Sequence, residues 1–193
     1  MCRFKSGLIL KNRCVVAPED NDSHSDLLES LNIEDTRENA MRMFVRAELI
    51  PKNNKWWNNP SDWEFVVDQD ILPDWFTEDK GKYEEEFRNA VISWWNEHVI
   101  VDKKIEELSS GFYRLKRCEV KRLCKDVKAL LDNATVTEMC GNATVTNMCG
   151  NATVTEMWDN ATVTNFKNKS KLVAKNHLPI VEFENKVEEE NED

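Results

Sequence analysis

Residues 133–168 read NATVTEMCGNATVTNMCGNATVTEMWDNATVTNFKN, so one nonapeptide is written four times almost without change. Within each copy Ala, Val and Met (Phe in the last copy) alternate with Thr, which is typical of a strand with one buried and one solvent-facing side. Asn, with Gly or Asp before it, joins one copy to the next and favours a turn. Two copies therefore predict one coil of a β-solenoid, about 18 residues long, with Ala, Val and Met inside and Thr outside.

A looser form of the repeat reaches back toward the N-terminus. The step Val-x-x-Leu or Val-x-x-Met recurs from Val120 onward and continues through the exact copies. It predicts a solenoid over residues 112–171, about three coils long. Residues 118–131 also fit the i, i+3, i+4, i+7 stripe of a helix, so helix and strand both stay open for that segment.

The letters that vary between copies follow the two-copy period. Glu138 and Glu156 alternate along the chain with Asn147 and Asn165. With two copies per coil, we expect the solenoid to carry one acidic side and one neutral side. The copies lack the Gly-Gly-x-Gly-x-Asp pattern of calcium-binding β-rolls, so we expect neither a metal nor a cofactor.

Residues 1–111 predict a separate α+β domain, because strand-like alternation and helix-like spacing follow one another there. The expected elements are a hairpin at 6–18, helices at 21–33 and 36–43, strands at 44–51 and 62–71, a turn at 73–76 and a long helix from Lys82 to Val101. The acids at 84–86 suit the positive N-terminal end of that helix. Beyond the solenoid, residues 172–193 comprise a predicted capping strand (LPIVEFENK) and an acidic tail.

Tryptophan is concentrated in the first domain, where six of the seven lie between Trp56 and Trp95. Rings of this size bury large areas, so we expect them to build the core of the domain. Trp56 and Trp57 are the expected exceptions because the sequence around them, KNNKWWNNPSD, is rich in turn-forming residues. These two rings are therefore candidates for a binding surface.

The chain is strongly acidic, with 26 Lys and Arg against 36 Asp and Glu and a net charge of −10. Residues 1–110 carry −9 of this total. Such a surface repels nucleic-acid phosphates and membrane headgroups and favours a basic partner. The basic run at 113–128 could contact phosphates or dock on the acidic first domain. No signal peptide or membrane span is recognisable, so we expect a cytoplasmic protein with free thiols.

Two residues are candidates for catalysis. Removal of Met1 would make Cys2 the N-terminal residue, and its α-amine could then act as the base for its own thiolate. His24 lies between serines and near aspartates at a predicted helix start, where it could be a base or a metal ligand. An inert thiol and a surface histidine are the simpler interpretations, and no closed zinc signature supports either residue.

Several segments together resemble a group of uncharacterised proteins encoded by bacteriophages and mobile elements of gut bacteria. The segments are MCRFKSGLILKNR, NDSHSDLLESLNIED, FVRAEL, VDQDILPDWF, GFYRLKRCEVK and the nonapeptide repeats. The resemblance implies action inside a bacterial host cell, where small acidic proteins of this origin often inhibit host defence, as anti-CRISPR proteins do. It transfers no activity and no catalytic residue to this chain.

The favoured function is a non-enzymatic interaction protein that binds a host protein with a basic surface. An N-terminal-nucleophile hydrolase built on Cys2 and a self-assembling structural protein built on the repeats are the alternatives. The side chains expected to make binding contacts are two tryptophans, three helix acids and five members of the basic run, namely Trp56, Trp57, Glu84, Glu85, Glu86, Arg114, Lys116, Arg117, Lys121 and Arg122.

Overall fold

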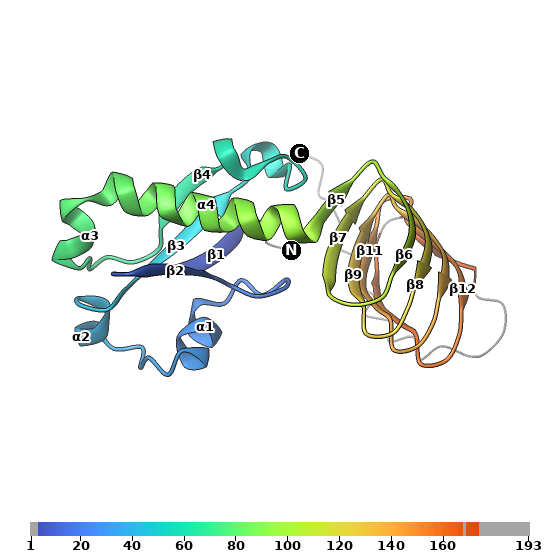
Figure 1. The fold of residues 1–193 in the computed structure, drawn as a ribbon, viewed down its shortest axis with the longest axis horizontal. Helices are drawn as coiled ribbons and strands as arrows, with labels where there is room; N and C mark the ends of the chain where they lie inside the picture. Colours follow the sequence, from blue (N-terminus) through green and yellow to red (C-terminus); the bar gives the residue numbers. More distant parts are fainter. Residues whose placement is uncertain (1–3, 168, 174–193) are drawn as a thin grey trace, which may run out of the picture. The chain divides into compact units, whose positions relative to one another are not determined.

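The computed structural model describes residues 4–167 and 169–173, and the chain forms two compact units that divide between His98 and Val99 (Figure 1). The first unit is an α+β domain and the second is a parallel β-solenoid, which confirms the predicted fold class. The division lies earlier in the chain than the expected boundary between residues 111 and 112. The predicted capping strand and acidic tail lie outside the described residues.

A four-stranded antiparallel sheet in the order β2-β1-β3-β4 is the centre of the first unit. Its strands form where the alternating pattern predicted them. They are β1 (Lys5–Leu10), β2 (Arg13–Val16), β3 (Phe44–Ile50) and β4 (Glu64–Val67). The helices are α1 (His24–Ser30), α2 (Arg37–Ala40), α3 (Asp74–Glu78) and α4 (Lys80–His98), with 3-10 turns at Lys52–Asn54 and Pro60–Asp62.

Helices cover both faces of this sheet, with α4 on one side and α1 and α2 on the other (Figure 1). Successive residues of a strand point to opposite faces. Gly7 faces α4, and a Cβ at this position would lie 2.7 Å from the ring of Phe87, so glycine allows the helix to approach closely. Leu8 faces the other way and packs with Leu27 and Phe44.

Two of the predictions for the first unit need correction. The segment expected as a turn, 73–76, opens the short helix α3, because a proline and an acid at its start suit a helix N-terminus. The long helix α4 begins at Lys80 and ends at His98, three residues before the predicted end, because residues 99–101 form a strand of the solenoid. The acids at 84–86 consequently lie beyond the first turn, where the helix dipole has little effect.

Ten described strands of the second unit alternate in chain order between two parallel five-stranded sheets, so each coil contributes one strand to each sheet. One sheet comprises β5 (Val99–Val101), β7 (Phe112–Lys116), β9 (Lys128–Asp132), β11 (Thr144–Cys149) and β13 (Thr162–Phe166). The other comprises β6 (Lys104–Leu108), β8 (Glu119–Leu123), β10 (Thr135–Met139), β12 (Thr153–Met157) and β14 (Lys171–Leu172).

The interior of the solenoid is filled by the positions that the repeat predicted. Each Ala, Val and Met of the four copies is at most 5 % exposed, and the threonines lie outside. Val136 lies beside Val154 and Met139 beside Met157, so like side chains stack from coil to coil. The buried column continues into the earlier coils through Val120. Each coil thereby buries the apolar edge of its neighbour.

The solenoid is longer than predicted because its first coils have a different length. Thr135 pairs with Thr153, eighteen residues later, as the repeat requires. Lys104, however, pairs with Glu119 only fifteen residues later, and Glu119 pairs with Thr135 sixteen residues later. A search for the 18-residue period of the repeat therefore does not detect these shorter coils. Residues 119–131 lie in strands β8 and β9, which belong to different sheets, and in the turn between them, so the helical alternative is wrong.

The corners between strands depend on residues with positive φ, which glycine, asparagine and aspartate tolerate best. In the exact copies these residues are Asn133, two glycines and Asp159, with φ between 51° and 67°. Gly141 also needs its missing side chain, because a Cβ there would lie 2.8 Å from the backbone nitrogen of Lys125. Asparagines link the corners, since Asn160 Nδ2 donates to Asn142 Oδ1 at 3.2 Å.

The variable letters of the repeat form two separate columns, as predicted. Glu138 lies beside Glu156 in one sheet, and Asn147 lies beside Asn165 in the other. On the preceding coil, the position beside Glu138 is occupied by Arg122, whose Nε lies 3.2 Å from a carboxylate oxygen of Glu138. The acidic side is therefore partly neutralised by a base that the exact copies do not contain.

Candidate interaction surface

Of the two predicted catalytic residues, His24 lies within the described residues and Cys2 lies outside them. His24 is the first residue of α1 and is only 9 % exposed, so it is not the surface histidine that the sequence suggests. Its Nε2 lies 3.3 Å from the carbonyl oxygen of Ala47, and its Nδ1 lies 3.5 Å from a carboxylate oxygen of Asp68. Burial lowers the pKa of His24, so the neutral ring is favoured near neutral pH.

The two tryptophans predicted to be exposed differ in burial. Trp56 is only 8 % exposed, and its backbone carbonyl accepts a hydrogen bond from Trp95 Nε1 at 3.0 Å. Trp57 is half-buried and meets Trp56 edge to face, with 5.8 Å between the ring centroids. The surrounding residues do form 3-10 turns, but the first ring is folded inward. Trp56 therefore belongs to the core, which corrects the expectation that it is exposed.

The helix acids predicted as binding contacts are partly matched by bases on α4 itself. Glu84 accepts a hydrogen bond from Arg88 at 2.9 Å, and a carboxylate oxygen of Glu86 lies 3.9 Å from Lys82 Nζ. Glu85 is exposed. Pairs one turn apart on a helix neutralise each other locally. This group consequently offers less net negative charge than the sequence suggests.

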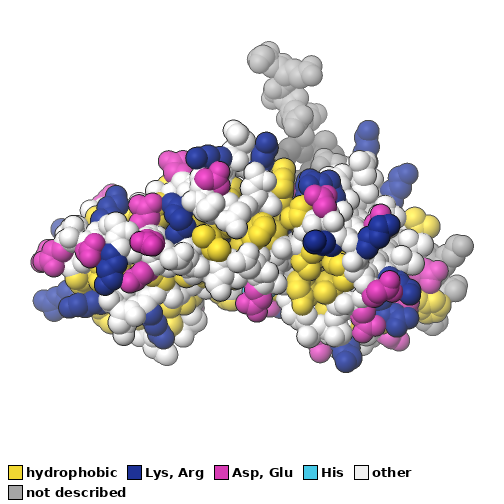
Figure 2. Space-filling view, turned by 45° about the horizontal axis from the view of Figure 1, so that its top comes forward, with side chains coloured by type: hydrophobic (Ala, Val, Ile, Leu, Met, Phe, Trp, Pro, Cys, Tyr) yellow, Lys and Arg dark blue, Asp and Glu magenta, His cyan; other side chains and the backbone are white. Residues whose placement is uncertain are grey.

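The basic run at 113–128 pairs with acids on neighbouring coils of the solenoid. Lys116 and Asp132 form a buried pair, with 2.6 Å between Nζ and a carboxylate oxygen. The more exposed pairs are Arg117–Asp102, Lys121–Glu106, Arg122–Glu107 and Arg122–Glu138. Arg114, also predicted as a binding contact, is only 6 % exposed. Figure 2 shows basic and acidic side chains interleaved over the solenoid. Four bases of the run therefore have solenoid acids as partners. Asp102, Glu106 and Glu107 belong to the predicted first domain of residues 1–111, but the structure places them in the second unit.

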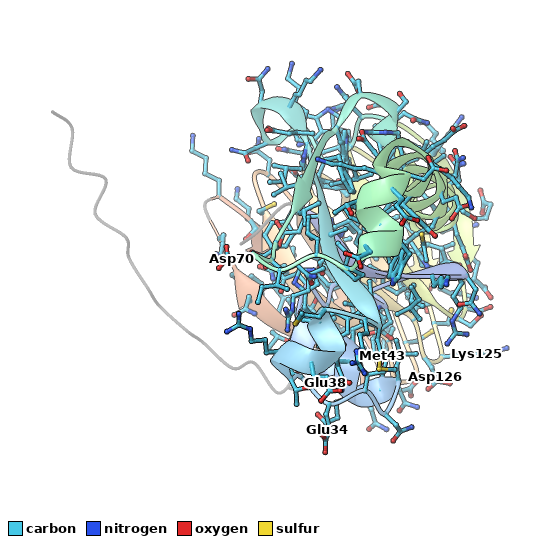
Figure 3. The ribbon with its side chains drawn as sticks, turned by 90° about the vertical axis from the view of Figure 1, so that its left-hand side faces the viewer. Glu34, Glu38, Met43, Asp70, Lys125 and Asp126 are labelled. Atoms are coloured by element: carbon cyan, nitrogen blue, oxygen red, sulfur yellow. The ribbon has the colours of Figure 1, made fainter. Side chains whose placement is uncertain are left out.

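The segment from α1 to α2 carries a surface that the sequence analysis did not single out. Glu29, Glu34 and Glu38 are exposed on it, and Figure 3 shows Glu34 and Glu38 with Met43 at the lower edge of the view. Among the described residues, no basic side chain pairs with Glu29 or Glu34, whereas Glu38 lies 3.1 Å from Arg42. The rim of this surface is therefore net acidic.

Exposed methionines lie in the same segment. Among the large apolar side chains of the described residues, only Met41, Met43 and Val173 are exposed, the first two at 51 % and 45 %. Leu28 and Ile33 lie in a shallow hollow of about 450 Å³ that acids of the rim also line. Acids around flexible apolar side chains suit a basic, amphipathic partner. We call this the α1–α2 surface and define it as Glu29, Glu34, Glu38, Met41 and Met43.

Local hydrogen bonds hold the backbone under the α1–α2 surface. The Thr36 side chain accepts from the backbone N–H of Asn39 and so caps α2. Asn39 in turn donates through Nδ2 to the carbonyl oxygen of Glu34 at 2.9 Å. The carbonyl oxygen of Asn39 accepts from the N–H of Met43 at 2.7 Å. One asparagine thus fixes an acid and a methionine of the surface near each other.

The sequence contains a signal for this surface in TRENAMRM, residues 36–43. A threonine cap followed by one acid, Glu38, and then Met41 and Met43 indicates a helix start with apolar residues near it. The helix that forms is a single turn, so it cannot direct both methionines toward the core. Sequence periodicity does not predict so early an end to the helix.

Comparison with protein-family models, with curated proteins and with solved structures returns no match. None of the helices in the described part of the chain is long and apolar enough to cross a membrane. What the protein does must therefore be inferred from its own surfaces and charges.

Proposed function

We propose that this chain is a non-enzymatic interaction protein that binds a basic, amphipathic segment of another protein through the α1–α2 surface. The observation that carries the proposal is the coincidence of exposed methionines with acids that lack a basic partner. Met41 and Met43 are half-exposed or nearly so, and no base among the described residues pairs with Glu29 or Glu34.

Charge and apolar contact would have different roles in such a complex. Residues 1–98 carry 12 Lys and Arg against 20 Asp and Glu, so the first unit attracts a basic partner from a distance. Methionine side chains are unbranched and polarizable, so they adapt to the apolar residues of the partner after contact. Association should consequently slow at high salt, while the apolar contacts limit dissociation.

The resemblance to phage and mobile-element proteins supplies the setting of the proposal. A partner in the cytoplasm of a bacterial host, with a basic groove that normally holds nucleic acid, has the required charge. Inhibition of a host-defence protein, as anti-CRISPR proteins do, is the role that this setting favours. The residues of the α1–α2 surface themselves specify only the chemistry of the partner.

A pull-down from bacterial lysate with a charge-matched control tests the proposal. The wild-type chain should retain a basic protein at low salt and release it at high salt. The double variant Glu29→Gln/Glu34→Gln should lose that protein. The control Glu64→Gln/Glu78→Gln removes the same charge from exposed acids elsewhere in the first unit and should retain it.

Two outcomes would contradict the proposal. Equal retention by both double variants would mean that total charge, and not the α1–α2 surface, attracts the partner. Absence of any retained protein at low salt would mean that the surface has no partner of this kind in the lysate.

A further inference from the structure

Three side chains with metal-ligating atoms converge beneath α1. His24 begins α1, Glu48 lies in β3, and Asp68 directly follows β4. One nitrogen or oxygen atom from each lies within 4.8 Å of the other two. Burial and the carboxylates of Asp68 and Asp22 raise the pKa of Glu48, as expected where acids face one another in a partly buried place.

The hydrogen bond of His24 decides which ring nitrogen faces the acids. A backbone carbonyl can only accept, so the contact of Nε2 with the Ala47 oxygen at 3.3 Å places the ring proton on Nε2. In the neutral ring, Nδ1 then carries a lone pair and faces the carboxylate of Asp68 at 3.5 Å. Two electron pairs that face each other repel unless a proton or a metal cation lies between them, and a metal ion fits this place. Histidines that bind metals commonly have this arrangement, with the other ring nitrogen donating to a carbonyl.

A buried hydroxyl on the same side of the sheet is a second, independent observation. Ser6 lies directly opposite Glu48 in the pairing of β1 with β3, so both side chains project from one face. Ser6 is fully buried, and its Oγ has no hydrogen-bond partner among the described residues. Buried hydroxyls normally have a partner. A metal-bound water at this place would supply one.

We propose that His24, Glu48 and Asp68 bind a divalent transition-metal ion, with zinc as the best match. One imidazole and two carboxylates are ligands that zinc accepts, and a fourth position stays open to the water that would bond Ser6. Tetrahedral ligands around zinc lie about 3.4 Å apart when the bonds are ~2.1 Å. His24 and Asp68 already have this separation, and the third ligand atom, on Glu48, lies within 4.8 Å of both.

One positive charge near the cluster competes with a metal. Arg46 projects from the same face of β3 as Glu48, but its guanidinium pairs with Asp35. This pair engages the arginine with a carboxylate that is not part of the cluster. The proposed site joins α1, β3 and β4 and would stabilise the first unit when a metal is bound.

Zinc titration of the full chain, followed by ¹⁵N NMR of the histidine rings, tests the proposal. After treatment with a chelator, zinc should shift the Nδ1 resonance of His24 with saturation near one equivalent, while Nε2 stays protonated. Asp68→Asn should weaken this binding by about tenfold or more. Asp68 is exposed, so the substitution should leave the fold intact. The matched control Asp70→Asn changes an exposed acid two residues away and should bind like the wild type.

Zinc uptake without a shift of His24 would overturn the proposal, because the free cysteines would then be the ligands. Equal affinity of the Asp68→Asn and Asp70→Asn variants would overturn it as well. Ser6→Ala provides a further check. It should weaken zinc binding without lowering the stability of the metal-free protein, since no described residue forms a hydrogen bond with the hydroxyl.

Discussion

The two units of this protein differ in how their charged side chains are paired. Residues 99–173 carry 12 Lys and Arg against 9 Asp and Glu, and the strand register places several of these opposite one another on adjacent coils. Residues 1–98 carry 12 against 20, and no base among the described residues pairs with Glu29 or Glu34 of the α1–α2 surface. A solenoid repeats its geometry, so a base on one coil meets an acid on the next. The irregular segment of the first unit has no such repetition and can present unmatched charge.

The largest effect on the free energy of unfolding is expected at the buried ion pair of the solenoid. Asp132→Ala leaves the ammonium of Lys116 buried without its carboxylate, which should lower the free energy of unfolding by about 3 kcal/mol. The exposed Asp126 is the matched control, and Asp126→Ala should cost well under half as much. Denaturant unfolding measures both changes.

A double variant sharpens the same test. If pairing is the cause, Lys116→Met/Asp132→Leu should recover most of the stability that Asp132→Ala loses, because an apolar pair can replace a buried ion pair. No recovery would show that Asp132 acts through its other contact, with Asn133.

The next largest effect is expected at a solenoid corner. Gly141→Ala places a Cβ against the backbone of Lys125 at positive φ, which should cost about 2 kcal/mol. Gly81→Ala in α4 meets open space and should be neutral or slightly stabilising. Equal effects of the two substitutions on the thermal midpoint would contradict this account of the corner.

A small effect is expected for the surface pairs between coils. Arg122→Ala removes the contacts with Glu107 and Glu138, but these groups are partly exposed and screened by water. The free energy of unfolding should change little, and high salt should reduce even that change. A large, salt-independent loss would mean that the surface pairs are essential to the stacking of the coils.

The smallest effect on stability is expected on the α1–α2 surface. Glu29→Gln/Glu34→Gln should change the free energy of unfolding by less than about 0.5 kcal/mol, because neither acid pairs with a base in the part of the chain that the structure describes. Thermal unfolding at low salt checks this. A marked loss of stability would show that the two acids serve the fold, and the functional assignment of the surface would be wrong.

The sequence predicted the fold where side chains repeat and not where contacts depend on distant pairing. The 18-residue coil, the buried Ala, Val and Met and the two columns of Glu and Asn all follow from the nonapeptide. The repeat does not predict the coils before Thr135, because these coils have fifteen or sixteen residues and other side chains in their core. The sequence does not predict the end of α4 at His98. The apolar residues after it continue the helical stripe, although they pair as a strand.

The candidate sites were harder to predict for the same reason. His24 was singled out from its local sequence, but Glu48 and Asp68 join it only through the pairing of β3 with β4. Trp56 was expected on the surface because its neighbours form turns, yet the tertiary packing buries its ring. The bases between Arg117 and Arg122 form a conspicuous run in the sequence, but their partners lie about one coil away.

Site-specific photo-crosslinking tests the central claim, that the α1–α2 surface binds a basic partner, most directly. A photoreactive residue replaces Met41 in one variant and the exposed Glu85 of α4 in the other, and each is irradiated in bacterial lysate. We expect position 41 to capture one basic protein, and that capture should disappear in the Glu29→Gln/Glu34→Gln background. Position 85 should not capture it. Capture of the same protein from both positions, or capture that persists without the two acids, would contradict the account.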